Sequence, residues 1–574
     1  MEHSTHDTSH KSMVTLFIDG MKLKVPAGTT ILDAARGIGV KIPTLCNFPG
    51  LYKRAVCRLC VVECDGGGRL KAACATEVWE GVKVTSQSPA LFNMRKEIVE
   101  LLLSQHPDDC FSCEKNLNCD LQKLAFQFGI KKLSFLKDPI IPKPKSESAT
   151  LIRDMEKCVK CARCVAACQV EQKVGAISTV ARSLDFAVST PYGDEFKCGP
   201  CVFCGRCAAV CPVAAIYQSD EVDLALDALY DPELSTSVVF SNESLIGLTD
   251  EFKLPPGTLT KDLGPLLFKR LGFRRVFQRD FFKSIASVAL ANELLEKLQT
   301  PESLPLISSC STSWEGFIRT YYPSLLKLVS KVLGIDDIYG ILNRNTDKDD
   351  CQAPEIATQT DSPVKLKPSA FTVSPCLARK FEIESRPSSV VPTFDHALTT
   401  RELVRLIKIS GMDLTRLKRG QMDPSIAEGV PATDSNEGLN GIARAIYTLE
   451  SLGEKGRTNA KGESYDDVVE IKVPHAGQIL SFVLVFGMAA AAKVFDGIAG
   501  GNQNYAFVKV MCCPEGCLEG GGQAPSTLER LRNLREENAK AREVPTGLEA
   551  LFHEREAFAF FESLKWRHAL FRGK

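Results

Sequence analysis

Two runs of closely spaced cysteines constrain the fold of this chain more than any other feature. The first run is Cys158-x2-Cys161-x2-Cys164-x3-Cys168, and the second is Cys201-x2-Cys204-x2-Cys207-x3-Cys211-Pro212. Thiolates at such short, repeated intervals suit iron–sulfur clusters, because iron is a soft acceptor for thiolate. A backbone that closes around two such groups has little freedom. The duplication therefore predicts a compact, internally repeated fold.

The Cys-Pro that ends the second run sets its register. Both runs are similar to those of bacterial two-cluster ferredoxins, in which the fourth cysteine of each run binds the other cluster. We therefore predict two [4Fe–4S] cubanes with crossed ligand sets. One set is Cys158, Cys161, Cys164 and Cys211. The other set is Cys201, Cys204, Cys207 and Cys168. Cys198 is an alternative to Cys201 that the Cys-Pro register disfavours.

Two further groups of ligand-type residues precede these runs. The first is Cys46, Cys57, Cys60 and Cys74, and the second is His106, Cys110, Cys113 and Cys119. Four thiolates suit a [2Fe–2S] rhomb, with zinc as the alternative. One imidazole and three thiolates suit a [4Fe–4S] cubane, although His106 is either a ligand or an incidental neighbour. Cys64 falls outside the pattern and is interpreted as a packed thiol.

The composition excludes several classes of protein. The 574 residues carry 70 Lys+Arg and 70 Asp+Glu, a balance that argues against binding to nucleic acid or to an anionic membrane surface. The longest apolar stretch, 480–492, is too short for a membrane span. The 23 cysteines are odd in number and no secretory signal precedes them, which argues against a disulfide framework. A cytoplasmic location is the default expectation.

The pattern of apolar and turn residues predicts a multidomain α+β and α/β chain. Alternation on both sides of Asp19-Gly20 predicts a hairpin, and Thr30-x-x-Asp33 predicts a helix start. A polar insertion at 343–362 is expected to loop out. The expected parts are a disordered tail (1–12), a β-grasp [2Fe–2S] ferredoxin (13–90), a helical His-ligated [4Fe–4S] module (91–136), a two-[4Fe–4S] ferredoxin (150–220), a large α/β region (225–525) and a helical C-terminal segment (526–574).

The later motifs resemble those of iron-only, or [FeFe], hydrogenases. The segment VSPCLARKFE at 373–382 resembles the family's MPCxxKxxE, and MCCPEGCLEGGGQ at 511–523 resembles MACxxGCxxGGGQ. SSCSTSW at 308–314, with YYP at 321–323, resembles TSCCPxW and its downstream YYP. TTRE at 399–402 matches TTREL. The order of the cysteine groups also resembles long members of this family, and the first two groups resemble the large iron–sulfur subunit of respiratory NADH dehydrogenase.

The resemblance implies a site in the large region. In the family, these motifs hold a cubane that one cysteine bridges to a two-iron subcluster with CO, cyanide and an azadithiolate, where dihydrogen is split. Cys376, Cys513 and Cys517 match the ligands, with Cys517 as the bridge. Cys310-Ser311 replaces two adjacent cysteines, a proton relay and a ligand. Either Cys310 is the relay and Ser311 the ligand, or Cys310 is the ligand and the relay is empty.

Other positions depart from the family pattern. Arg379 replaces the lysine that contacts a cyanide, and Glu243 falls in the segment matching APSVR. The TGGVMEA stretch survives only at 437–443, and the two-glutamate proton path retains Glu293 but has Leu290 at the partner position. Cys512, next to a ligand position, is either a replacement ligand or a packed thiol. These departures predict a pocket that has lost the two-iron subcluster.

Three functions follow as hypotheses. The first is an electron-transfer subunit with one [2Fe–2S] cluster, three [4Fe–4S] clusters and a further [4Fe–4S] cluster in the hydrogenase-like region. It would need a partner, either a flavin- and NAD(P)H-binding subunit or a ferredoxin, because no nucleotide-binding glycine motif is present. The second is an active hydrogenase with a variant site, in which Cys310 and Glu293 move protons. The third is a redox or dihydrogen sensor.

Overall fold

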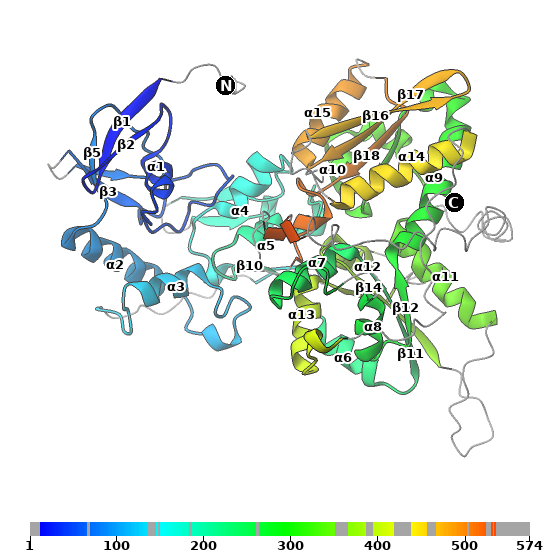
Figure 1. Ribbon diagram of the computed structural model, residues 1–574, viewed down its shortest axis with the longest axis horizontal. Helices are drawn as coiled ribbons and strands as arrows, with labels where there is room; N and C mark the ends of the chain where they lie inside the picture. The colour runs from blue at the N-terminus through cyan, green and yellow to red at the C-terminus, as the bar shows by residue number, and fades with distance from the viewer. Residues whose placement is uncertain are drawn as a thin grey trace.

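The computed structural model of the protein describes most of the chain. The described residues are 12–65, 69–135, 145–146, 148, 150–182, 186–193, 195–259, 263–349, 366–385, 394–417, 438–455, 467–501, 504–523, 530–531 and 533–534. The predicted tail up to residue 11, most of the stretch 136–149 and most of the C-terminal segment lie outside them. A five-stranded sheet lies at one end of the molecule, two four-stranded sheets lie at the other, and the cysteine runs lie between them (Figure 1). The chain is a mixed α/β protein of several domains.

The N-terminal sheet has the strand order β2-β1-β5-β3-β4. Its strands are β1 (Met13–Ile18), β2 (Met21–Pro26), β3 (Val61–Cys64), β4 (Arg69–Ala72) and β5 (Lys83–Thr85). The predicted hairpin is confirmed: β1 and β2 pair antiparallel, and Asp19 and Gly20 both have positive φ, as a two-residue turn of this kind requires. The predicted helix start is also confirmed, because Thr30 Oγ1 accepts from Asp33 N at the start of α1 (Ile31–Gly37).

Two helices join this sheet to the cysteine runs. Helix α2 (Pro89–Ser104) is tied to the sheet by Arg95, which donates to the carbonyl of Val61 at 2.5 Å. Helix α3 (Asp120–Gln127) is tied to the runs through its first residue. Asp120 N donates to the Pro212 carbonyl at 2.9 Å, and the Asp120 carboxylate pairs with Arg163 at 2.9 Å. The N-terminal parts therefore pack against one another through specific contacts.

The two cysteine runs have the same local backbone. Lys160 and Ala162 in the first run, and Phe203 and Gly205 in the second, all have positive φ. These left-handed residues turn each Cys-x2-Cys loop sharply before a short helix. The helices are α4 (Arg163–Val165) and α5 (Arg206–Val210). The strands around them are β6 (Lys145–Ser146), β7 (Leu151–Asp154), β8 (Ser178–Val180), β9 (Ala187–Ser189) and β10 (Ile216–Gln218).

The large region contains two four-stranded sheets, ordered β12-β11-β14-β15 and β13-β18-β17-β16. The strands are β11 (Leu234–Phe240), β12 (Arg275–Gln278), β13 (Leu306–Ser309), β14 (Lys367–Val373), β15 (His396–Leu398), β16 (Val468–His475), β17 (Gln478–Phe486) and β18 (Phe507–Met511). All neighbours pair parallel except β16 and β17. The apolar stretch at 480–492 is a buried strand followed by a helix start, as expected of core.

Helices surround both sheets. They are α6 (Val222–Tyr230), α7 (Asn242–Glu251), α8 (Leu263–Arg270), α9 (Arg279–Leu298), α10 (Glu315–Tyr321), α11 (Ile335–Asp349), α12 (Ala378–Glu384), α13 (Thr400–Ile409), α14 (Gly438–Lys455) and α15 (Met488–Ala499). The predicted loop at 343–362 is wrong at its start, because α11 continues to Asp349. Ile335, Ile338 and Tyr339 pack on the first sheet and carry the helix into the polar stretch. Residues 350–362 lie outside the described chain.

Parallel strands from both sheets end at the region that the motifs mark. Ser241 follows β11, Ser374 follows β14, Cys310 follows β13 and Cys512 follows β18. In open parallel sheets, the carboxyl ends of the strands are the usual place for a site, because the connecting loops converge there. The fold therefore gathers residues that are far apart in sequence at one place between the two sheets.

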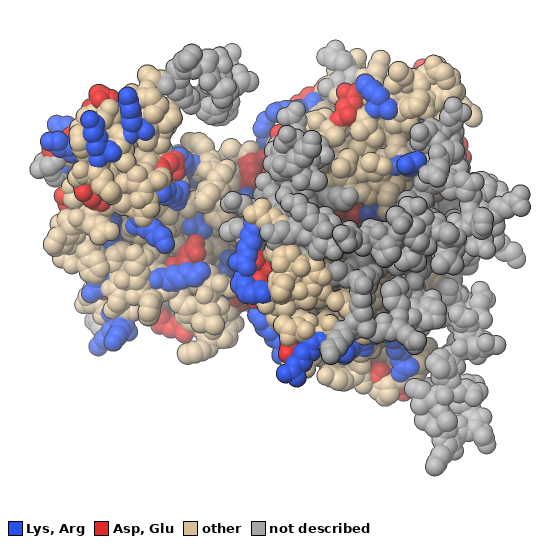
Figure 2. Space-filling view, in the orientation of Figure 1, with Lys and Arg blue, Asp and Glu red and all other residues tan. Residues whose placement is uncertain are grey.

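The distribution of charge on the surface says little about what the chain binds. Basic and acidic side chains are interspersed over the N-terminal parts on the face that Figure 2 shows. None of the helices in the described ranges has both the length and the apolar composition that crossing a bilayer requires.

The cysteine runs dock on the large region through glycines. A Cβ atom on Gly521 would lie 2.5 Å from Gly205 Cα and 2.6 Å from the Cys204 carbonyl oxygen. A Cβ on Gly520 would lie 2.2 Å from the Pro375 carbonyl oxygen. The glycine run of the last motif thus permits close backbone approach between the loop of Cys204 and the loops of the large region.

Gly521→Ala is expected to destabilise this contact, because the backbone atoms it would meet have no room to move. Overpacking of this kind costs about 1–3 kcal/mol, which would lower the thermal midpoint of the iron-loaded chain. Gly37→Ala is the matched control, since nothing lies within 4 Å of a Cβ there. Equal midpoints for the two variants in anaerobic calorimetry would contradict the packing argument.

Candidate metal centres

The first cysteine group comes together beside the N-terminal sheet. The Cys46 thiol is in hydrogen-bond contact with those of Cys57 and Cys74, and Cys74 is in contact with Cys60. Cys46 N also donates to Cys57 Sγ at 3.4 Å. The contacts from Cys57 and Cys74 lower the pKa of Cys46 strongly, so the site favours a thiolate. Cys64 is buried in the sheet core, and burial raises its pKa, as expected of a packed thiol.

The second group lies on the loop between α2 and α3. His106 is buried just after α2, whereas Cys110 is exposed and Cys113 is partly exposed. Cys119 caps α3, and its sulfur accepts from Gln122 N at 3.5 Å. Burial raises the pKa of Cys119, and the nearby Cys113 adds to the rise. This loop is the most exposed of the predicted cluster sites.

The two cysteine runs line two separate cavities. The first cavity, of about 320 Å³, has Cys158, Cys161, Cys164 and Cys211 in its wall. The second cavity, of about 370 Å³, has Cys168, Cys201, Cys204 and Cys207. Each cavity thus takes three thiols from one run and the fourth from the other. The thiols stand around a space: among the described residues, no three His, Cys, Asp or Glu side chains converge on a point that would hold a single ion.

The chemistry of these walls fits iron–sulfur clusters. Burial raises the pKa of Cys161 and of Cys204 to about 12 in each case, and it raises that of Cys207 still further. A buried thiol of this kind becomes a thiolate only when a cation replaces its proton. Four such thiols around a closed, largely apolar space are the donor set of a cubane.

Four more thiols lie together in the large region, and they are called the terminal thiols below. They are Cys310, Cys376, Cys513 and Cys517. All four side chains are partly exposed, and desolvation by the surrounding protein raises the pKa of Cys376 to about 11, with Cys310 adding to the rise. Burial raises the pKa of Cys513, and the other three terminal thiols and Cys204 of the second cavity add to the rise. The terminal thiols therefore adjoin the cavity of the second cysteine run.

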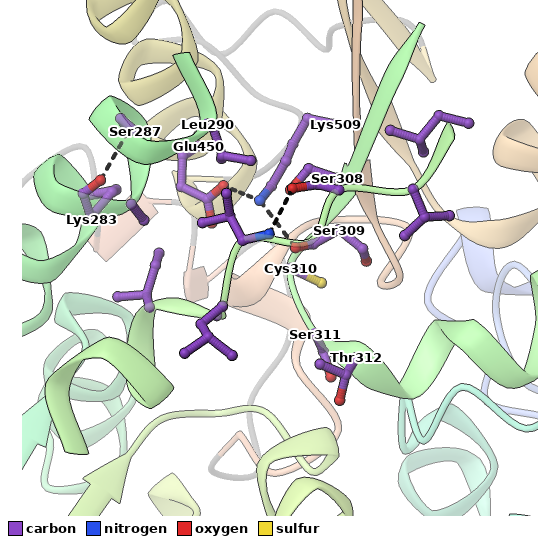
Figure 3. A pocket seen from close by; sticks show the side chains of 18 of the residues that line it. Lys283, Ser287, Leu290, Ser308, Ser309, Cys310, Ser311, Thr312, Glu450 and Lys509 are labelled. Atoms are coloured by element: carbon purple, nitrogen blue, oxygen red, sulfur yellow. Dashed lines mark hydrogen bonds and ion pairs between the residues drawn. The ribbon is translucent and has the colours of Figure 1, made fainter. Parts of the chain in front are cut away.

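Cys310 differs from the other terminal thiols. Its thiol is in hydrogen-bond contact with that of Cys512, and this contact, with help from Lys509 and Arg379, lowers the pKa of Cys310 to about 6. Cys310 also lines a separate cavity of about 580 Å³, called the serine cavity below. Figure 3 shows Ser308, Ser309 and Cys310 on one wall of it.

The serine cavity contains a charged pair. Lys509 pairs with Glu450 and donates to the carbonyl of Ser309 at 3.1 Å (Figure 3). Leu290 also lines the cavity. Glu293 lies one turn further along α9, where it accepts from Ser330 Oγ at 2.5 Å.

Ser311 is part of a hydrogen-bonded network. Its Oγ donates to Glu382 Oε1 at 2.9 Å and accepts from Ser313 N at 3.2 Å. The other oxygen of Glu382 pairs with Arg379 at 2.7 Å. Arg379 also pairs with Asp336 at 3.0 Å and donates to the Cys310 carbonyl at 2.7 Å. The guanidinium therefore already has two carboxylates and one carbonyl as neighbours within the protein.

A chain of buried charges continues beyond Arg379. Asp336 also pairs with Arg279 at 3.2 Å, Arg279 pairs with Glu454, and Glu454 pairs with Lys283 at 2.6 Å. Burial opposes the ionisation of Asp336, but Arg379 and Arg279 outweigh it and lower its pKa to about 2. This network was missed from the sequence, although the glutamate that ends the motif at 373–382 pointed to Glu382.

Cys517 faces carboxylates. Glu454 and Glu243 both raise its pKa beyond the effect of burial, and Arg279 partly offsets them. Glu243 is itself buried near the start of α7, and burial raises its pKa to about 7. Two carboxyl groups therefore lie on this side of Cys517, one with a raised pKa and the other paired with Arg279 and Lys283.

Comparison with known proteins identifies the parts of the chain. Residues 235–521 match the iron only hydrogenase large subunit, C-terminal domain. Residues 11–89 match a 2Fe-2S iron-sulfur cluster binding domain, and residues 95–133 match the NADH-ubiquinone oxidoreductase-G iron-sulfur binding region. The sequence-based resemblance is thus confirmed for all three parts.

Whole-chain relatives agree. The chain is 32% identical over 539 residues to the NADP-reducing hydrogenase subunit HndD of Solidesulfovibrio fructosivorans, covering 89% of each chain. It is 26% identical over 536 residues to iron hydrogenase 1 of Clostridium pasteurianum, covering 90% of this chain and 91% of that one. It is 37% identical over 197 residues to the alpha subunit of the NADPH-Fe(3+) oxidoreductase of Geobacter sulfurreducens, but this match covers only 23% of that relative. A match that extends over nearly all of HndD, together with the iron-only hydrogenase domain at 235–521, places this iron–sulfur protein in the iron-only hydrogenase family.

Proposed function

We propose that the chain is an electron-transfer subunit that ends in a cubane without a two-iron subcluster. Electrons enter at a β-grasp [2Fe–2S] domain (13–90) and a His-ligated cubane module (91–136). They pass the twin cubanes (150–220) and reach the terminal thiols in the hydrogenase-like domain (225–525). The chain supplies the electron path, and the partner supplies the hydride chemistry.

Continuity of the packed core supports this path. One apolar core contains side chains from every cysteine group: Cys57, Cys119, Cys164, Cys211, Cys201 and Cys376 pack in it or against it. Cys204 and Cys513 lie close enough to influence each other electrostatically across the glycine contact. Consecutive cluster sites are therefore neighbours, as single-electron transfer requires. This continuity is the observation that carries the proposal.

We assign the ligands from these groupings. The [2Fe–2S] cluster takes Cys46, Cys57, Cys60 and Cys74, and the next cubane takes His106, Cys110, Cys113 and Cys119. The twin cubanes take the two crossed sets that line the first and second cavities. The last cubane takes the four terminal thiols. Cys310 is its fourth ligand, because Ser311 directs its hydroxyl to Glu382 and Cys310 adjoins the other three.

The buried charges argue against a two-iron subcluster. A cation at position 379 would have to contact an anionic cyanide, but Arg379 already pairs with Asp336 and Glu382. Cys517, at the bridging position, faces Glu243 and Glu454. Burying anionic ligands beside these carboxylates is unfavourable. The fit therefore fails for the two-iron unit, whereas it holds for a cubane.

The relatives indicate what kind of partner subunit this chain would have. The relative from Solidesulfovibrio fructosivorans is a subunit of an NADP-reducing hydrogenase. A subunit that binds flavin and NAD(P)H would exchange two electrons as hydride and pass them singly to this chain. Pull-down of the full chain with candidate subunits, followed by NAD(P)H-driven cluster reduction, tests this pairing.

An active hydrogenase with a variant site is the second candidate. The lowered pKa of Cys310, about 6, suits an acid–base group beside a cavity. In that case Ser311 would be the ligand. Infrared bands of CO and cyanide distinguish the two candidates, because they arise only from the two-iron unit.

Iron analysis tests the cluster assignment. The chain reconstituted without oxygen is expected to hold about 18 irons, and Cys376→Ala about 14, because the terminal cubane is lost. No CO or cyanide bands are expected after co-expression with the maturation enzymes, nor in Ser311→Cys, because the charges remain. About 14 irons in the unmodified chain would show that the terminal cubane is absent. Infrared bands of CO and cyanide would show that the two-iron unit is present.

Arg379→Met tests the buried network. It leaves Asp336 and Glu382 each with one ion partner fewer, so a loss of about 3–5 kcal/mol in unfolding free energy is expected. Arg319→Met is the control, because its pair with Glu315 at 3.7 Å is exposed and is worth about 1 kcal/mol or less. Thermal unfolding of both iron-loaded variants measures the difference. Similar small shifts would show that the network is not structural.

Glu243→Gln tests whether the raised pKa of the buried Glu243 carboxyl makes the stability of the chain depend on pH. The pKa of Glu243 rises from an ordinary 4.5 to about 7 on folding, so the folded state holds its proton more tightly. The free energy of unfolding of the unmodified chain therefore falls by up to about 3 kcal/mol as pH rises from about 4.5 to 7. The variant lacks this loss, so its melting temperature is expected to exceed that of the unmodified chain at pH 8 and to match it near pH 5. A pH-independent difference would contradict the assignment.

A further inference from the structure

Arg163 lies where three proposed cluster sites meet. It stands between Cys161 and Cys164 of the first cysteine run, which both line the first cavity, and it begins the short helix α4. Only 6% of the residue is exposed. A buried guanidinium needs acceptors within the protein, because water no longer supplies them. Two of the three acceptors of Arg163 come from outside its own domain.

The side chain of Arg163 reaches both N-terminal parts of the chain. Nη2 donates to the Asn47 carbonyl at 3.3 Å, and the guanidinium lies over the Phe48 ring, 5.5 Å from its centroid. Nη1 pairs with the Asp120 carboxylate at 2.9 Å and donates to the Val210 carbonyl at 3.4 Å. One terminal nitrogen therefore contacts the [2Fe–2S] domain, and the other contacts the helical module.

Each of the three acceptor residues is the chain neighbour of a proposed cluster ligand. The pairs are Asn47 with Cys46, Asp120 with Cys119, and Val210 with Cys211. These ligands belong to the [2Fe–2S] cluster, the His-ligated cubane and the first of the twin cubanes. A ligand sulfur moves with the backbone beside it, so a single side chain would hold three clusters in their relative positions.

The second cysteine run has an arginine at the matching position. Arg206 directly precedes the third cysteine of its run, as Arg163 does in the first. Its guanidinium lies 5.9 Å from the centroid of the Phe48 ring, but it pairs with Glu171 of its own domain at 3.0 Å. The duplication therefore explains an arginine at this point of the loop. The ion pair that Arg163 forms with another module needs a separate reason.

We propose that Arg163 is a positioning residue that fixes the [2Fe–2S] cluster and the His-ligated cubane at constant distances from the first of the twin cubanes. The inference rests on the proposed function, which assigns these clusters. Single-electron transfer slows steeply as two clusters move apart, so small shifts between the modules would impair it. A guanidinium suits this role, because its planar fork donates to two partners at once, whereas an ammonium is a single point of charge.

Electron paramagnetic resonance of the fully reduced chain, reconstituted without oxygen, tests this role. Two reduced clusters broaden each other's signals, and the effect falls steeply with the distance between them. The [2Fe–2S] signal is identified as the one that Cys74→Ala removes. It is expected to be broadened in the unmodified chain and to narrow in Arg163→Met. Arg163→Lys keeps the charge but serves only the carboxylate of Asp120, so the [2Fe–2S] signal is expected to narrow there as well.

Arg153→Met is the matched control. Arg153 is also 6% exposed and lies in the same domain as Arg163. Its acceptors all belong to that domain, and they are Ser189 Oγ, Thr190 Oγ1 and the Gly193 carbonyl. Its loss is expected to lower the thermal midpoint without narrowing the [2Fe–2S] signal. A role in stability alone would leave the signal unchanged in both arginine variants, since the folded molecules would keep their cluster distances.

Asp120→Ala releases the helical module alone. The Asp120 side chain is 38% exposed, so this variant perturbs the core less than the loss of Arg163 does. The signal of the His-ligated cubane, which Cys113→Ala removes, is expected to narrow, and the [2Fe–2S] signal is expected to stay broad. If Arg163→Met binds less iron than the unmodified chain, Asp120→Ala decides, and an unchanged signal of the His-ligated cubane refutes the inference.

Other outcomes also overturn the inference. An unchanged [2Fe–2S] signal in Arg163→Met at about 18 irons refutes it while the proposed function stands. Equal narrowing in Arg153→Met would show that loosening of the domain, and not the contact between modules, moves the clusters. A broad signal in Arg163→Lys would show that charge alone is sufficient. Absence of any [2Fe–2S] signal from the unmodified chain would instead refute the proposed function itself.

Discussion

The replacement of protons by iron on buried thiols is the interaction on which the rest of the structure depends. Burial raises the pKa of Cys161 and Cys204 to about 12, so these side chains remain neutral thiols unless a cation binds. The first cavity is lined by thiols and apolar residues, and Gln172 and Arg206 join them in the wall of the second. A bound cation would replace the protons on these thiols. We infer that folding of the N-terminal third and cluster assembly are one process, as in other small metal-dependent domains.

Near the terminal thiols, one carboxylate contacts the residues at two positions where the chain departs from the family pattern. Glu382 Oε1 accepts from Ser311, and its other oxygen pairs with Arg379. The serine where the family motif has cysteine and the arginine where it has lysine thus contact the same buried carboxylate. A guanidinium presents several donors in a fixed plane, so it binds Glu382 and Asp336 together, which a lysine ammonium does less well. The two substitutions are therefore best understood as one structural adaptation.

The sequence predicted local features and repeated patterns well. The hairpin at Asp19-Gly20 and the cap at Thr30 depend on neighbouring residues, and both were found. The cysteine motifs identified the family because their spacing reflects cluster geometry. The contact of Cys310 with Cys512 was not predictable, since it depends on the register of β13 and β18.

The buried network was missed for a similar reason. Asp336, Arg279 and Glu454 come from α11, α9 and α14, and nothing in their local sequence marks them as partners. Charged residues in amphipathic helices are usually solvated, so sequence alone favours a surface position. In the structure, packing between elements that are distant in sequence buries these residues instead. The end of α11 was misplaced on the same grounds, because its apolar contacts with the sheet outweigh its polar composition.

Charged side chains are distributed unevenly around the terminal thiols. Cys110 is exposed near one end of the proposed path, whereas the terminal thiols at the other end are only partly exposed. An added electron in a buried site is favourable only near positive charge or hydrogen-bond donors. Lys509 and Arg379 lie beside Cys310, whereas Glu243 and Glu454 lie beside Cys517. Reduction of a cubane there would therefore place the added charge toward Cys310, on the side away from the position where a two-iron unit would attach.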